Sequence, residues 1–197
     1  MAQIQYNKIS LIQINKDLAI RRNALPVLQS KESALRAEAR RIRMQIKKLE
    51  ERIREKTAML SSNMRMFGEL PKLIELDRVT FAKKNIASIN VLVVDQVLFK
   101  SEEFSLSANP AWFLPGIELI KETIILHAER INLGRILESI EYARRKTTQK
   151  VNLYEKVQIP FFEEAIRKIK RFLEDEDNLS KSSQKVLKRR MEAAVAI

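Results

Sequence analysis

The chain has 197 residues and no cysteine, which excludes disulfide bonds, thiolate catalysis and zinc–thiolate sites. Only 3 Gly and 5 Pro interrupt it, while 31% of the residues are charged and 45% are hydrophobic, a composition typical of long amphipathic helices. The formal net charge of +12 is carried by the two ends, because residues 68–177 contain 17 basic and 18 acidic side chains. Such ends suit an acidic partner surface or nucleic acid.

Residues 1–67 are predicted to form one coiled-coil helix. Across residues 11–67, two positions of a seven-residue repeat are mostly apolar. A repeat of 3.5 residues that continues over about eight heptads is typical of a coiled coil. The charged residues that fall on this seam are Arg21, Glu32 and Lys56.

Residues 68–116 are predicted to be an insertion between the helices. The stretch 86–106 is rich in Val, Ile and Phe and divides into two strand-like runs around Asp95 and Gln96, which predicts a β-hairpin. Residues 109–116 have the composition of a turn-rich connector, and the aromatic residues in it favour a small satellite core.

Residues 117–197 are predicted to form a second long helix that ends in a basic tail. Both helices carry an apolar seam that must be covered, and the simplest cover is the other helix folded back on it. The expected fold is therefore mainly α, a long antiparallel two-helix coiled coil with a β-hairpin insertion. Pro160 lies inside the second helix, where a proline costs about 3 kcal/mol.

The charged seam residues predict a register for this helical pair, because a charge on a buried seam requires a partner. In antiparallel helices, the residue numbers of partners add up to a near-constant value, since both helices rise equally per residue. The three predicted pairs, whose numbers add up to 197 or 200, are Arg21 with Glu176, Glu32 with Lys168, and Lys56 with Glu141.

The sequence shows no pattern for catalysis or for binding a cofactor. The three glycines lie far apart, so they form no phosphate-binding loop. The one histidine, His127, has no second histidine or cysteine near it for a metal and is interpreted as a structural or surface residue. No apolar stretch reaches the roughly 20 residues that span a membrane. We expect a non-catalytic, cytoplasmic protein without cofactor or metal.

Residues 151–176, VNLYEKVQIPFFEEAIRKIKRFLEDE, resemble without gaps the C-terminal signature of the D subunits of V-type/A-type rotary ATPases. That signature begins approximately VNALE-x-V-x-IP-x-L-E. The positions that match are Val151, Asn152, Glu155, Val157, Ile159, Pro160, Glu163, Ile166, Ile169, Leu173, Glu174 and Glu176.

Two further segments carry the resemblance. Residues 18–35 are similar to the family's N-terminal segment, although Ala24 replaces the usual glycine and Pro26 is unusual. The aligned residues of this segment are Arg22, Leu28, Lys31 and Leu35. Residues 185–190 resemble the family's basic ending through Lys188, Arg189 and Arg190.

The resemblance implies a central stalk rotor shaft that has no catalytic residue of its own. Its paired helices would enter a head of alternating A and B subunits, and its middle region would lie near the stalk's F subunit and the rotor adaptor, the C subunit. The shaft would couple ATP hydrolysis or synthesis to rotation of a ring that translocates ions, H⁺ or Na⁺, and would be peripheral to the membrane. The matching residues are then expected at the interface between shaft and head.

The residues themselves leave two other interpretations open. The basic ends are compatible with a coiled coil that binds nucleic acid, although few aromatic side chains for base stacking accompany the basic runs. The heptads alone are equally compatible with a scaffold coiled coil.

Overall fold

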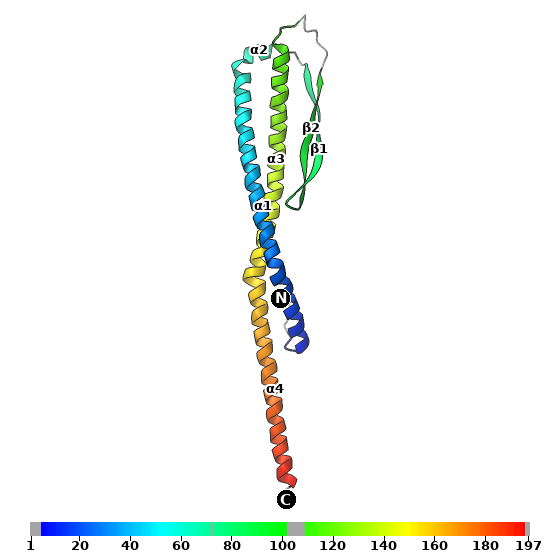
Figure 1. Cartoon of the computed structure of the whole chain (residues 1–197), viewed down its shortest axis with the longest axis vertical. Helices are drawn as coiled ribbons and strands as arrows, with labels where there is room; N and C mark the ends of the chain where they lie inside the picture. Colours follow the sequence, from blue (N-terminus) through cyan, green and yellow to red (C-terminus); the bar gives the residue numbers. More distant parts are fainter. Residues whose placement is uncertain (1–4, 72, 102–108, 196–197) are drawn as a thin grey trace. The chain divides into compact units, whose positions relative to one another are not determined.

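The computed structural model describes residues 5–71, 73–101 and 109–195 (Figure 1). The elements are, in chain order, α1 (Lys8–Ser62), α2 (Met64–Gly68), β1 (Ile74–Ile86), β2 (Ile89–Ser101), α3 (Phe113–Leu153), the π-helix η1 (Tyr154–Gln158) and α4 (Ile159–Val195). This order confirms the mainly α fold in which long helices flank a hairpin. The chain divides into two compact units, residues 31–146 and residues 1–30 with 147–197.

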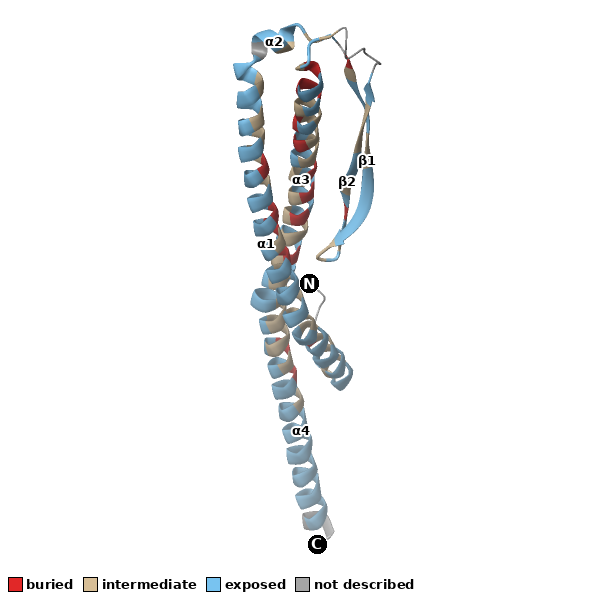
Figure 2. Cartoon of the chain, turned by 45° about the horizontal axis from the view of Figure 1, so that its top comes forward, coloured by how far each residue is buried: buried red, intermediate tan, exposed pale blue. Residues whose placement is uncertain are grey.

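In the unit of residues 31–146, α1 and α3 run side by side and the hairpin lies along α3 (Figure 1). The core is formed by Leu35, Ala39 and Ile42 of α1, Ile136 and Ile140 of α3, and Val91 of β2. Figure 2 shows the buried positions of α1 on the side that faces α3, and those of α3 on the sides that face α1 and the hairpin. The heptad seam predicted from the sequence is therefore the surface that the helices bury.

The two strands confirm a hairpin in the insertion, but neither its turn nor its predicted bounds of 86–106, because β1 lies almost entirely before that stretch. Ile86 pairs with Ile89, so the connection consists of Ala87 and Ser88. The prediction of a turn at Asp95–Gln96 is wrong, because both residues lie within β2. Residues 102–106, the predicted end of the hairpin, lie outside the described residues.

Polar side chains hold this turn where the usual Asn-Gly pair is missing. Ala87 and Ser88 have φ of 50° and 66°, the left-handed conformation that a two-residue type I′ turn requires at both positions. The Asn85 amide oxygen accepts a hydrogen bond from the backbone N–H of Ser88 at 3.1 Å, and its amide nitrogen donates to Asn90 at 2.9 Å. These bonds offset part of the cost of the left-handed backbone.

Replacing Ala87 by Asn and Ser88 by Gly is expected to stabilise the hairpin by about 1 kcal/mol, because the left-handed conformation costs most other residues roughly 1–2 kcal/mol. Hydrogen exchange of the strand amides should slow about fivefold. The matched control, Asp95→Asn with Gln96→Gly, places the same pair inside β2 and should speed exchange, since Gly weakens a strand. Equal effects at both places would contradict the observed turn.

The α3 helix begins at Phe113, four residues before the predicted start at residue 117. Pro115 is tolerated there, because the first-turn N–H groups of a helix have no intrahelical acceptor. Phe113 packs edge-on against Trp112, with ring centroids 4.7 Å apart, in a small cluster that includes buried Leu73 and Ile117. The aromatic connector thus forms the satellite core that its composition favoured.

The register of α1 and α3 differs from the prediction. Interhelical ion pairs join Lys56 to Glu122 at 2.5 Å and Glu50 to Arg130 at 3.0 Å, so partner numbers add up to about 180. The predicted partner of Lys56 was Glu141, which instead pairs with an arginine of α1.

The predicted pair of Glu32 with Lys168 is also replaced by others. Glu32 lies 2.9 Å from Arg36 and 3.8 Å from Arg144. Lys168 binds Glu164 on its own helix at 2.8 Å.

A heptad pattern determines which faces of two helices meet, but not how far one helix is displaced along the other. The packing of Phe67 on Trp112, with ring centroids 5.9 Å apart, brings the end of the first helical segment to the start of α3 and sets the register.

The ion pair between Lys56 and Glu122 also changes the pKa of Glu122. The hydrogen bond from Lys56, and then its charge, lowers the pKa of the Glu122 carboxyl. Because the pKa of Glu122 is lower in the folded state, the pair stabilises the fold fully at pH values above the ordinary glutamate pKa. This contribution is lost as the pH falls through the lowered pKa of Glu122. Both groups are solvated, so the contribution is small.

The unit of residues 1–30 and 147–197 pairs the start of α1 with the end of α3, η1 and the first half of α4. Leu18, Ala165 and Ile169 are buried in this pair. The ring of Tyr6 lies 5.4 Å from that of Phe172, near the end of the pairing. Within the described residues, no helix combines the length and the apolar character that a membrane crossing requires.

Candidate partner-binding surface

Pro160 converts the turn before it into a π-helix. A proline has no N–H to donate, and its ring clashes with the carbonyl four residues earlier. Residues Tyr154–Gln158 accordingly form η1, in which the N–H of Ile159 donates to the carbonyl of Tyr154, five residues back. The helix therefore continues through the proline with one widened turn instead of breaking.

The widened turn moves Gln158 onto the seam and leaves Val157 48% exposed. Arg21 Nε donates to the Gln158 amide oxygen at 3.0 Å. Glu176, the predicted partner of Arg21, is 18 residues further along the helix, roughly 27 Å away. This third predicted ion pair is therefore wrong as well.

Arg21 is held by several groups at once. Besides Gln158, its guanidinium binds the Asp17 carboxylate at 3.1 Å and lies 4.7 Å from the centre of the Phe162 ring. The neighbouring Arg22 binds Glu163 at 2.5 Å, and 59% of its side chain is exposed. The signature residues Arg22 and Glu163 are thus brought together, while Arg21 makes the stronger set of contacts.

Arg21→Ala is expected to lower the free energy of unfolding by about 2–3 kcal/mol, because hydrogen bonds to a charged group and a cation–π contact are lost together. Arg22→Ala, next to it, should cost at most about 1 kcal/mol, as exposed ion pairs do. Urea denaturation followed by circular dichroism measures both. A larger loss at Arg22 than at Arg21 would contradict this arrangement.

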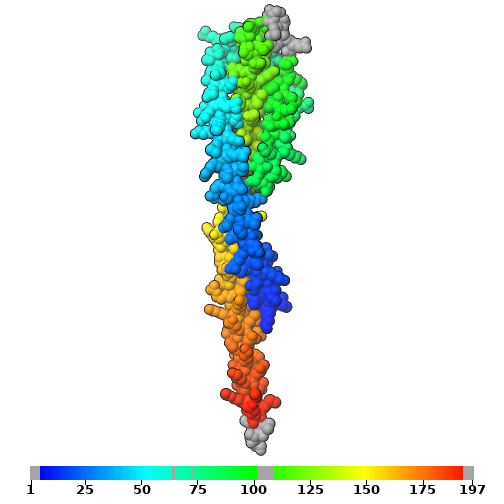
Figure 3. Space-filling view, in the orientation of Figure 1, coloured from blue at the N-terminus to red at the C-terminus, as the bar shows by residue number. Residues whose placement is uncertain are grey.

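Beyond the pairing with α1, the end of α4 is uncovered. Every residue from 174 to 192 is exposed, and no other segment lies over this end in the view of Figure 3. Its large apolar side chains are 50% to 71% exposed: Leu179, Val186, Leu187 and Met191. Leu179 and Val186 are one heptad apart, so they continue the seam without a partner among the described residues.

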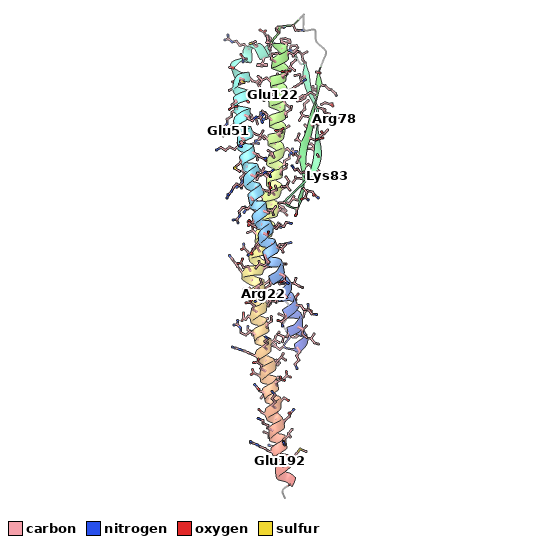
Figure 4. All side chains as sticks on the ribbon, in the orientation of Figure 1. Arg22, Glu51, Arg78, Lys83, Glu122 and Glu192 are labelled. Carbon is pink, nitrogen blue, oxygen red and sulfur yellow. The ribbon has the colours of Figure 1, made fainter. Side chains whose placement is uncertain are left out.

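The same end of α4 is basic. After the acidic residues 174–177, five cations occur before the next acidic residue: Lys181, Lys185, Lys188, Arg189 and Arg190. Lys188 lies 3.9 Å from Glu192, which Figure 4 labels. An exposed apolar heptad stripe among cations suits the surface of a partner. The sequence pattern places these apolar residues on the second helix but does not show that they are uncovered.

The residues singled out by the family resemblance fall into two groups. Those that are buried or half-buried in the helical pair are Leu28, Leu35, Val151, Ile159, Glu163, Ile166, Ile169 and Leu173. Those that are exposed are Arg22, Lys31, Asn152, Glu155, Val157, Pro160, Glu174, Glu176, Lys188, Arg189 and Arg190. The first group builds the helical pair, and the second group is the more accessible to a partner.

The fold and this surface define a class of protein, a coiled coil with an inserted hairpin and an uncovered helical end. Within the described residues, no group of three or more His, Cys, Asp or Glu side chains is placed to hold a metal ion. The arrangement offers contacts for a macromolecular partner.

Comparison with known proteins identifies the family. The family model for the D subunit of ATP synthase matches residues 10–189. The V-type ATP synthase D subunit of Borreliella burgdorferi is 28% identical over 193 residues, covering 95% of each chain. That of Chlamydia trachomatis serovar L2 is 25% identical over 197 residues, covering 97% of each chain. The chain belongs to the family of ATP synthase D subunits.

Proposed function

We propose that this chain is the central rotor shaft, the D subunit, of a V-type/A-type ATPase. The observation that carries the proposal is the family match over residues 10–189. The relatives named as D subunits of V-type ATP synthases align over nearly their whole length, which supports the same role here. The shaft itself is non-catalytic and lies in the cytoplasm, peripheral to the membrane and attached to it only through the rest of the complex.

The uncovered end of α4 is the part that enters the catalytic head of A and B subunits. Its apolar stripe and its cations contact the inner surface of the head. Because a single helix continues beyond the pairing with α1, the end presents different faces to the subunits around it. Turning such an end places the catalytic sites in different states, which couples rotation to ATP hydrolysis or synthesis.

The unit of residues 31–146 faces the lower stalk, where the F subunit and the adaptor, the C subunit, bind. Stiffness comes from the packed seam, whose central residues Leu35 and Ile140 are fully buried. A packed pair of helices resists twisting better than a single helix, so torque passes from the head to the ion-translocating ring.

Reconstitution tests this proposal. Head subunits assembled with and without the chain are compared for ATP turnover, and co-purification is measured at moderate salt. We expect a roughly equimolar complex and a turnover that depends on the chain. Turnover that is indifferent to the chain, together with DNA binding that weakens steeply with salt, would instead favour the nucleic-acid interpretation.

A further inference from the structure

A groove in the unit of residues 31–146 is assigned to no partner by the proposed function. It lies between α1, the hairpin and α3 and has a volume of about 470 Å³. Its floor is apolar and is formed by Ile42, Leu49, Leu133, Ile136 and Val93. Grooves of this size with an apolar floor and a few polar groups are typical of binding sites.

The rim of the groove is basic. Four cations line it, Arg41, Lys48, Arg52 and Lys84, against the two carboxylates Glu38 and Glu129. Arg41 is 3.5 Å from Glu38, at the long end of an ion pair. Among the described residues, Lys48 and Lys84 take part in no ion pair. The groove therefore has positive charge to offer to an anionic occupant.

Asn132 supplies an independent observation at the same place. The residue lines the groove, is only 6% exposed, and its side chain makes no hydrogen bond to any described residue. No described side-chain atom that is sealed from solvent lacks a partner, so the amide of Asn132 reaches the open space of the groove. An amide that reaches this open space can exchange bonds to water for bonds to an occupant of the groove.

The length of the groove indicates an extended occupant. The α1 residues on its rim run from Glu38 to Arg52, which corresponds to roughly 21 Å of helix. An extended chain covers this length with about six residues. The amide of Asn132 offers both a donor and an acceptor, which match the C=O and N–H of a peptide bond.

We propose that this groove binds an acidic peptide segment of a partner chain. One large apolar side chain of the segment lies on the floor, its carboxylates pair with Lys48 and Lys84, and its backbone bonds to Asn132. The groove belongs to the unit of residues 31–146 and the uncovered end of α4 to the other unit, so binding at the groove is tested independently of the proposed contact with the head.

The test uses the full-length chain and an array of random 12-residue peptides. Peptides bound by the unmodified chain should be enriched in Asp and Glu around a Leu, Ile or Phe. Fluorescence anisotropy of the strongest labelled peptide then gives dissociation constants for variants. We expect Lys48→Glu and Lys84→Glu each to weaken binding at least about tenfold, through loss of an attraction and gain of a repulsion.

The chain offers matched controls for both variants. Lys47→Glu and Lys83→Glu make the same charge change next to the rim but outside it, and should change the dissociation constant less than about twofold. Lys83 is labelled on the hairpin in Figure 4. Asn132→Asp, close in size, should weaken peptide binding about tenfold while the melting temperature confirms that the variant folds.

Three results would overturn the proposal. The first is a set of selected peptides without acidic enrichment. The second is an equal loss of binding in the rim variants and in their neighbours. The third is saturable binding of decanoate at this groove when no peptide binds, which would make it a site for a small anionic amphiphile. None of these readouts involves ATP turnover, so failure here leaves the shaft proposal untouched.

Discussion

Replacing Ile140 with alanine is expected to lower the free energy of unfolding by about 2–5 kcal/mol, the range measured when a large buried side chain is truncated. Ile140 is fully buried, and it packs in one cluster with Leu35 and Ile136. The cost combines lost apolar burial with the cavity left between two helices that cannot close on it. Urea denaturation followed by circular dichroism measures the change.

Ile131→Ala is the matched control on the same helix. Ile131 is 50% exposed, so its truncation should cost less than about 1 kcal/mol. If both variants lost the same stability, the seam between α1 and α3 would not be the core of the unit of residues 31–146.

Removing residues 174–197 should leave the chain folded but weaken the coupling between the shaft and ATP turnover. All described side chains from 174 to 192 are exposed, so the truncated chain should melt within a few degrees of the full chain. In a reconstituted complex, however, the dependence of ATP turnover on the shaft should fall at least about tenfold, because the surface assigned to the head is gone. The measurement is turnover with intact chain, truncated chain and no chain.

A chain in which residues 75–100 are replaced by a short Gly-Ser linker is the control for that truncation. It lacks the hairpin but keeps the end of α4, so head binding should persist. Retained coupling after truncation at residue 173, or lost head binding after hairpin removal, would contradict the assigned polarity.

The sequence predicted the helices correctly because amphipathic periodicity is a local signal that repeats many times. Leu35, Ala39 and Ile42 fall on the predicted seam and are buried. A hairpin was also predicted, since the β-branched residues of β2 cluster, but the charged stretch that forms β1 was not predicted as its first strand. Its turn was misplaced, because Ala87 and Ser88 have no intrinsic preference for positive φ and are held there by Asn85.

The register of the two helices could not be predicted from the sequence. With 31% charged residues, many displacements of one helix along the other pair opposite charges equally well. The displacement is decided by Phe67 and Trp112, which bring the end of the first helical segment against the start of α3. It follows that α4 continues past the start of α1 and leaves its apolar stripe uncovered.

The sequence by itself determined the helical faces, the hairpin and, through the signature around Pro160, the family. It did so because each of these depends on the order of neighbouring residues. Only the tertiary structure decided the partners of Arg21, Glu32 and Lys56, the π-turn that brings Gln158 to the seam, and the basic groove beside Asn132. Each of these depends on how segments that are distant in the sequence meet. Packing at a few tertiary contacts determines how they meet more strongly than any local sequence pattern does.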